Sequence, residues 1–189
     1  MWDLPTTVTI DDTTYNIRNK GDYHMMLDVI DTLNDVELTN EEKVISSLMI
    51  FYEGMDEIED VLKNRHTPEL YSEMNKFLGA GDNSGYKSNH KLVDWKTDES
   101  LIASGINNVI KQEVRTIPYL HWWTFIGYYM AVGESALSYV VGIREKIATG
   151  KKLEKAEREF VNKNPNYFAF VNSREQQERL IKEVWNVSE

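Results

Sequence analysis

The chain contains no cysteine and only 4 prolines among its 189 residues. Without cysteine there is no disulfide framework and no thiolate metal or redox centre, which is typical of proteins that work in a reducing compartment. No apolar run approaches the roughly 18 residues needed to span a bilayer, and the N-terminus lacks a basic segment followed by an apolar one. We therefore expect no membrane partner and a cytoplasmic protein.

Basic charge is scarce as well. The sequence has 21 Lys and Arg against 31 Asp and Glu, a net charge of −10. Binding to a nucleic-acid backbone depends on clustered Lys and Arg that release counterions, and no such cluster is present. The composition therefore argues against a nucleic-acid partner. It leaves open an acidic inhibitor that imitates nucleic acid, for which the net charge is the support.

Familiar catalytic and metal-binding motifs are missing. There is no glycine-rich nucleotide loop, no GxSxG, no HExxH and no EF-hand loop. The strongest acid–base pair is His121 with Glu134, but thirteen residues of continuous helix would separate them by roughly 20 Å. A histidine at a helix start that hydrogen-bonds to a backbone carbonyl is the favoured interpretation of His121. We predict no enzyme activity, no catalytic residues, no cofactor and no metal site.

The sequence pattern predicts a mainly α fold, a multi-helix bundle with a small N-terminal β-hairpin. Residues 7–10 and 13–18 alternate with β-branched and aromatic side chains around Asp11-Asp12, which suits a hairpin turn. From Asp22 onward the apolar residues recur at helical spacing. Thr39 and Glu42 have the spacing of a capping box, so a helix is expected to begin there. Pro68 suits the first turn of a later helix.

An acidic segment, residues 53–60, concentrates five carboxylates in eight residues. It lacks the alternating ligand spacing of a calcium loop, so a solvated acidic turn is expected. Residues 79–89 contain three glycines and almost no apolar side chain, which is typical of a linker. We predict an N-terminal part over 1–78, a linker or loop over 79–93 and a C-terminal helical part over 94–189, with one compact domain as the alternative. A last helix with opposed charge pairs is expected near 174–185.

The segment from Tyr119 to Phe125 is rich in aromatic residues and follows Pro118, which interrupts the preceding helix. Two adjacent tryptophans point about 100° apart on a helix, so protein must cover the segment on more than one side. Burial in the core is the more frequent role of such residues. A partner-binding surface is the alternative. Its candidate residues are Tyr119, Trp122, Trp123, Phe125 and Tyr129.

Several short motifs follow one another along the chain. They are Asp94-Trp95, Leu101-Ile102, Leu120-His121-Trp122-Trp123-Thr124-Phe125, Ile143-Arg144-Glu145-Lys146 and Gly150-Lys151-Lys152-Leu153. In this order they resemble a family of small proteins from the tail modules of long-tailed phages and prophages of Gram-positive bacteria. The most specific element is Leu-His-Trp-Trp-x-Phe followed about twenty residues later by Ile-Arg. The resemblance covers nearly the whole chain.

The resemblance implies a tail assembly chaperone or a related tail morphogenesis factor in the host bacterial cytoplasm. Members of that family are usually encoded beside the tape measure protein, so the expected partner is this long apolar helical protein, with other tail proteins and self-association as further possibilities. A structural tail component that stays in the virion is the first alternative. The acidic nucleic-acid mimic is the second.

Overall fold

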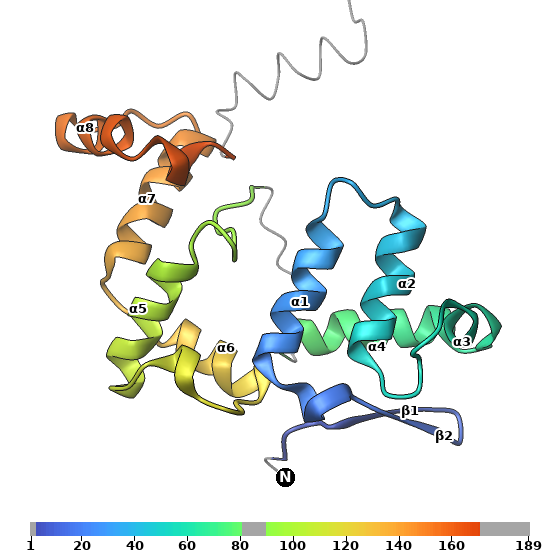
Figure 1. The fold of residues 1–189 in the computed structure, drawn as a ribbon. Coiled ribbons are helices and arrows are strands. Elements are labelled where there is room, and N and C mark those ends of the chain that lie inside the picture. Colours follow the sequence, from blue (N-terminus) through green and yellow to red (C-terminus); the bar gives the residue numbers. More distant parts are fainter. Residues whose placement is uncertain (1–2, 81–89, 171–189) are drawn as a thin grey trace, which may run out of the picture. The chain divides into compact units, whose positions relative to one another are not determined.

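The structure is a computed structural model that describes residues 3–80 and 90–170. The chain forms two compact units (Figure 1). Unit 1 comprises Met1–Gly85 and Arg115–Met130, and unit 2 comprises Tyr86–Val114 and Ala131–Glu189. The chain therefore leaves unit 1, returns to it for one helix, and leaves it again.

Unit 1 begins with the predicted hairpin. Strands β1 (Thr7–Ile10) and β2 (Thr13–Asn16) pair antiparallel, with Thr7 opposite Asn16 and Ile10 opposite Thr13. Asp11, the first residue of the two-residue turn, has a φ of 51°, a left-handed conformation that aspartate tolerates better than most residues. A short 3-10 helix, η1 (Arg18–Gly21), then leads into the helical part.

Four helices follow in unit 1: α1 (Tyr23–Asn34), α2 (Asn40–Phe51), α3 (Ile58–Lys63) and α4 (Thr67–Leu78). Helices α1 and α2 lie side by side (Figure 1). The predicted capping box is confirmed, since the Glu42 amide donates to Thr39 Oγ1 and the Glu42 carboxylate accepts from the Thr39 amide. Pro68 lies in the first turn of α4, as predicted. The core between these helices contains Met26, Val29, Leu48, Phe51, Leu70 and Met74.

The aromatic segment forms α6 (Trp122–Met130) in unit 1, preceded by the 3-10 helix η2 (Val114–Thr116). The sequence-based division had put this helix with the C-terminal helices. The structure groups it with the N-terminal ones because its side chains bond to the end of α4 and to the segment before β1. Contacts between residues more than forty positions apart leave no periodic signal in the sequence.

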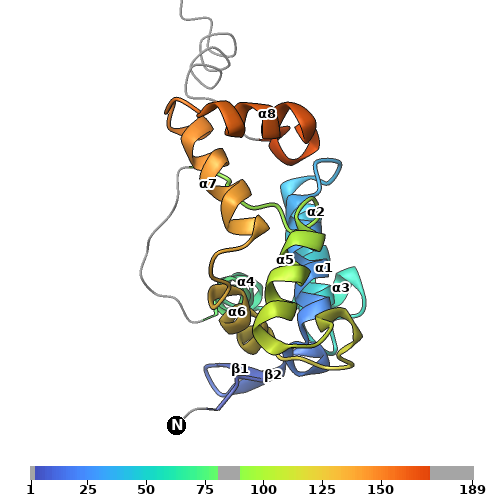
Figure 2. The same cartoon turned by 90° about the vertical axis from the view of Figure 1, so that its left-hand side faces the viewer.

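Unit 2 contains α5 (Glu99–Ile110), α7 (Ala136–Ala148), α8 (Lys155–Lys163) and the 3-10 helix η3 (Pro165–Phe168). Helix α5 lies beside α7, and α8 crosses the C-terminal end of α7 (Figure 2). Val140, Ile143 and Phe168 form a small buried cluster, covered by half-buried residues that include Leu101, Leu153 and Phe160. Gly150, directly after the α7 cap, has a φ of +70°, the conformation that commonly ends a helix.

The mainly α fold with an N-terminal hairpin is confirmed. The predicted acidic turn is wrong in one respect, because its second half belongs to α3. This helix has six residues and buries only Val61, too little for a periodic pattern. The expected helix near 174–185 and most of the expected linker lie outside the described residues. Among the described residues, no helix is long and apolar enough to cross a membrane.

Candidate partner-binding groove and the networks that hold it

His121 stands at the start of α6 and makes two hydrogen bonds of opposite kind. The amide of Trp123 donates to Nδ1 over 3.1 Å, and Nε2 lies 2.9 Å from the carbonyl oxygen of Pro5. Nδ1 therefore accepts, and Nε2 carries the proton and donates, which fixes a neutral imidazole. Burial lowers the pKa of His121, and the bond to Pro5 opposes this shift only in part. The favoured interpretation, a helix-start histidine bonded to a backbone carbonyl, is confirmed.

The segment before α6 is held against the start of α1. Asp22 is buried; one of its carboxylate oxygens accepts from the His24 amide and ring, and the other accepts from the Leu120 amide over 2.9 Å. Gly21 has a φ of +76°, and a Cβ placed there would lie 2.6 Å from Phe77 Cζ. Only glycine fits this close approach. These contacts fix the position from which α6 begins.

Both tryptophans of α6 bond to the end of α4. Trp122 Nε1 donates to the Leu78 carbonyl over 2.9 Å, and Trp123 Nε1 donates to the Phe77 carbonyl over 3.0 Å. The last carbonyls of a helix have no intrahelical partner, and the Trp122 indole bonds to one of them at Leu78. The Phe77 carbonyl accepts both the Trp123 indole and the Ala80 amide. The Leu-His-Trp-Trp-x-Phe motif therefore joins α6 to α4 through its two indoles.

Two of the five candidate partner-binding residues lie in the core. Trp122 is 1% exposed and Phe125 is 3% exposed. Phe125 stacks on Tyr23 with a centroid distance of 4.5 Å and on Trp122 with one of 5.5 Å. In folded unit 1 neither ring is accessible to a partner, because both are buried in the core.

Trp123 is half-buried and lines an open groove of about 340 Å³ in unit 1. The groove runs between β1 and α4, with the buried side chains of Ile17 and Phe77 beneath it. The remaining lining residues are Pro5, Thr7, Val8, Thr9, Glu73 and Lys76. Apolar groups with a few polar groups around them are typical of sites that bind a ligand or peptide. We call this feature the Trp123 groove.

The other two candidate residues are more accessible. Tyr119 is 48% exposed, and its hydroxyl donates to the Lys20 carbonyl over 3.2 Å. Desolvation, assisted by the negative charge of Asp22, raises the pKa of Tyr119. Tyr129 is half-buried near the C-terminal end of α6. Of the five predicted residues, Trp123 alone lines the Trp123 groove.

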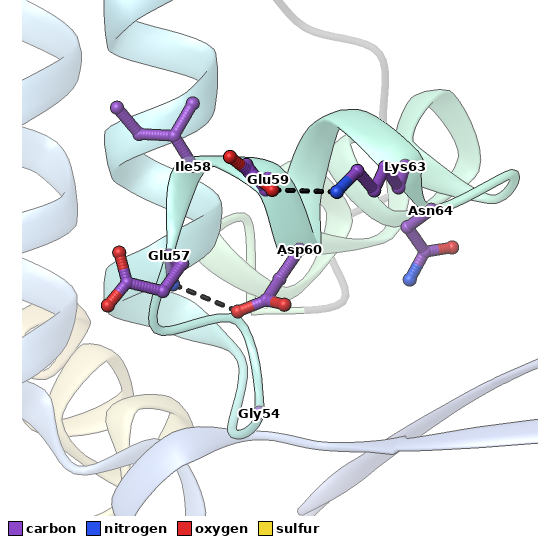
Figure 3. Close-up of a pocket in the computed structure, with 7 residues that line it drawn as sticks. All are labelled: Gly54, Glu57, Ile58, Glu59, Asp60, Lys63 and Asn64. Atoms are coloured by element: carbon purple, nitrogen blue, oxygen red, sulfur yellow. Dashed lines mark hydrogen bonds and ion pairs between the residues drawn. The ribbon is translucent and has the colours of Figure 1, made fainter.

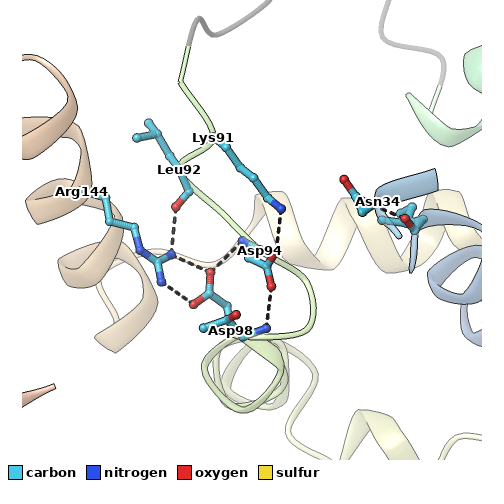
Figure 4. Close-up of polar contacts among 8 residues, drawn as sticks. Asn34, Lys91, Leu92, Asp94, Asp98 and Arg144 are labelled. Atoms are coloured by element: carbon cyan, nitrogen blue, oxygen red, sulfur yellow. Dashed lines mark hydrogen bonds and ion pairs between the residues drawn. The ribbon is translucent and has the colours of Figure 1, made fainter. Parts of the chain in front are cut away.

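Unit 2 has a different kind of centre, a fully buried ion pair. Arg144 on α7 donates from both terminal nitrogens to Asp98 at the start of α5, over 2.6 and 2.7 Å. The guanidinium also donates to the Leu92 carbonyl, as Figure 4 shows, and to the Tyr167 carbonyl. Its Cζ lies 4.5 Å from the centroid of the Phe170 ring. The guanidinium thus makes four hydrogen bonds to carboxylate and carbonyl oxygens. Such bonds are what a buried charge requires.

A second carboxylate, Asp94, supports this pair. Its amide donates to Asp98 Oδ2 over 3.0 Å, and its own carboxylate accepts from Lys91 and from the Thr97 amide. Burial raises the pKa of Asp94, but the Lys91 and Thr97 bonds outweigh that effect and lower the pKa to about 2. The loop before α5 is thereby tied to α7 through charged groups.

The ion pair was not predicted, although the sequence holds a trace of it. Arg144 falls on the buried stripe of α7 with Leu137, Val140 and Ala148. A charged residue in an apolar stripe at helical spacing indicates a buried partner, but the spacing does not say which one. Asp98 is 46 residues away.

The described residues contain no group of three or more His, Asp and Glu side chains placed to hold a metal ion. The fold and the groove define a mainly α-helical protein of two units. The sequence model of the Bacteriophage Gp15 protein family matches residues 1–170, and the chain belongs to this family. Membership of this family supports a bacteriophage structural or morphogenesis protein. No curated protein and no solved structure matches the chain.

Membership of a bacteriophage family confirms the broader part of the resemblance. The tail module, the Gram-positive host and the tape measure partner stay predictions.

Proposed function

We propose that this protein is a tail assembly chaperone that binds apolar helical segments of the tape measure protein and keeps them soluble in the cytoplasm of the host bacterium. The Trp123 groove carries the proposal. Here Trp123, a predicted partner-binding aromatic residue, lines an open hollow of unit 1. Membership of a bacteriophage family agrees with a role in assembly.

The groove suits transient contact with apolar side chains. A tryptophan supplies a large contact area, and residues of this type dominate the energetics of many protein interfaces. The indole bond to the Phe77 carbonyl fixes the orientation of Trp123, so the side chain would lose little conformational entropy when a partner binds. A volume of about 340 Å³ accommodates a few side chains rather than a whole helix. Such a site would bind one short apolar segment at a time.

The charge of the chain supports the same role. A tape measure segment exposed before the tail tube closes would aggregate, because its apolar surface has no cover. A net charge of −10 keeps the chaperone and its complex soluble. The carboxylates beside the groove are modest in number, and Glu73 is paired with Lys76 over 2.6 Å. The groove itself therefore selects apolar rather than basic groups.

A structural tail component that remains in the virion is the main alternative, and it would use the same family membership. Nucleic-acid mimicry has less support. Such a mimic needs a one-sided array of free carboxylates, whereas many carboxylates of the described residues pair with bases, as in Lys63 with Glu59 and Lys146 with Glu157.

The test is co-expression of the chain with apolar segments of the neighbouring tape measure protein, followed by pull-down. Val8 is half-buried and lines the groove, so Val8→Asp places a charge there and leaves the α4–α6 contacts unchanged. We expect the segment to be soluble with the wild type and insoluble with Val8→Asp. Tyr139→Asp, at an exposed apolar position in unit 2, is the matched control and should behave as the wild type. Circular dichroism establishes that each variant is folded. Two results together would overturn the chaperone proposal in favour of a structural tail component. The segment would remain insoluble with the wild-type chain, and the chain would be found in finished virions.

A further inference from the structure

Helix α3 presents a second, chemically different surface on unit 1. Ile58 is 54% exposed and Leu62 is 61% exposed, at positions i and i+4 of the same helix. Side chains four residues apart lie on one face. The helix is held through Val61, which is fully buried. The apolar pair is thus a fixed feature of the folded unit.

The segment that carries this pair is rich in carboxylates. The segment 53–65 has five acidic residues and two basic ones, a net charge of −3. All five acidic residues are exposed. Asp56 pairs with Arg18, Glu59 pairs with Lys63, and Asp60 accepts the amide of Glu57. Figure 3 shows Ile58 beside Glu59, with Glu57 on the adjoining part of the turn. A hollow of about 800 Å³ is lined by Gly54, Glu57, Ile58, Glu59 and Lys63 among others.

We propose that this α3 surface binds a cationic amphipathic helix of a partner protein. Apolar side chains of that helix would cover Ile58 and Leu62, and its Lys or Arg side chains would face Glu53 and Glu57. A cationic partner is favoured because the α3 surface is acidic. Opposite charge speeds the encounter of the two proteins, and like charge disfavours acidic partners. A second copy of this chain fits poorly, because two α3 surfaces face to face would bring carboxylates against carboxylates. The α3 surface and the Trp123 groove share no lining residue, so this proposal stands apart from the chaperone proposal.

The test is fluorescence anisotropy of the full chain with a labelled helical peptide of about 16 residues that has leucine on one face and lysine elsewhere. We expect Ile58→Ser with Leu62→Ser to weaken binding about tenfold, since both apolar anchors are lost. The control is Val36→Ser. Val36 is 92% exposed between Asp35 and Glu37, and this variant should bind like the wild type. The control separates the α3 surface from attraction of the peptide to the whole acidic protein.

A second variant tests the charge. Glu53→Gln with Glu57→Gln should weaken binding several-fold at low salt and flatten its salt dependence. A peptide with glutamate in place of lysine should not bind. The proposal is overturned if the Ile58/Leu62 variant binds as tightly as the wild type, or if the glutamate peptide binds equally well. Either result leaves the chaperone proposal intact, because the Trp123 groove is unchanged in every variant.

Discussion

The two units use opposite means to hold distant segments together. In unit 1 the side chains that bond α6 to distant segments are neutral, and His121, Trp122 and Trp123 bond to backbone carbonyls of Pro5, Leu78 and Phe77. A nearby carboxylate, Asp22, accepts a backbone amide just before the helix and pairs with no Lys or Arg among the described residues. In unit 2 the corresponding role falls to a buried charge, Arg144, bonded to Asp98. His121, Trp122, Trp123 and Arg144 belong to the motifs on which the family resemblance rests, whereas Asp98 does not. These motifs therefore record how each unit folds more than what the protein binds.

The difference has an energetic side. A neutral hydrogen bond contributes a net of roughly 0.5–1.5 kcal/mol, because the unfolded chain bonds to water instead. Removing one partner of a buried ion pair costs about 3–5 kcal/mol, because it leaves an uncompensated charge. Unit 2 should therefore depend strongly on one pair, whereas unit 1 distributes its stability over several rings and bonds.

The largest effect is expected from Asp98→Ala, which leaves Arg144 buried without its carboxylate. We expect the free energy of unfolding to fall by about 3–5 kcal/mol. Hydrogen exchange measured by mass spectrometry of peptides should accelerate, relative to the wild type, more in α5 and α7 than in α1 and α2. Asp98→Leu combined with Arg144→Met should be more stable than Asp98→Ala alone, since no charge is then stranded. Equal protection of α7 in wild type and Asp98→Ala would mean that the pair does not hold unit 2.

Trp122→Ala should cost unit 1 a comparable amount. The ring is buried between Phe125 and the end of α4, and truncation of a buried aromatic residue costs about 3–5 kcal/mol. Chemical denaturation monitors the global loss, and hydrogen exchange should locate it in α4 and α6. A matched truncation at Tyr139, which is 44% exposed and touches only the edge of the Phe160 ring among the described aromatic pairs, should cost about 1 kcal/mol. Similar losses at the two positions would contradict the placement of Trp122 in the core.

Trp123→Phe should have a smaller effect on folding. It keeps an aromatic ring and loses the bond to the Phe77 carbonyl, which corresponds to about 1 kcal/mol. Denaturant midpoints of the wild type and the variant measure this difference. A loss as large as that of Trp122→Ala would show that the two indoles are equivalent, which their different burial argues against.

The smallest effect concerns pH. The pKa of His121 is lowered in the folded protein, so the unfolded chain binds the proton more readily. The contribution of neutral His121 to stability is present above the unfolded pKa of about 6.5. It is lost as the pH falls from there toward the folded value. A nuclear magnetic resonance titration should place the folded pKa below 6.5, and the Trp123 amide should shift with the ring. A folded pKa above 6.5 would contradict the neutral imidazole.

The local part of the fold was predictable from the sequence. Alternating residues around Asp11-Asp12, the Thr39 capping box and Pro68 are each read within a few positions, and each is confirmed. The long-range part was not predictable. That α6 belongs to unit 1 depends on Trp122 and Trp123 reaching carbonyls more than forty residues earlier.

The candidate site shows the same limit. The sequence identifies an aromatic cluster, but it cannot tell which ring is buried, because adjacent residues on a helix differ only in the direction they face. Trp122 and Phe125 became core, and Trp123 came to line a groove whose other wall is the β-hairpin. Helix α3 was missed because its single buried residue gives no period.

The most direct measurement of the central claim is photo-crosslinking from the rim of the Trp123 groove. A photoreactive phenylalanine at the exposed position Thr9, which lines the groove, would be expressed with the tape measure protein, and the same residue at Tyr139 in unit 2 would serve as control. We predict a covalent product with an apolar tape measure segment from position 9 and none from position 139. No product from position 9, or equal products from both, would contradict a tape measure site in this groove.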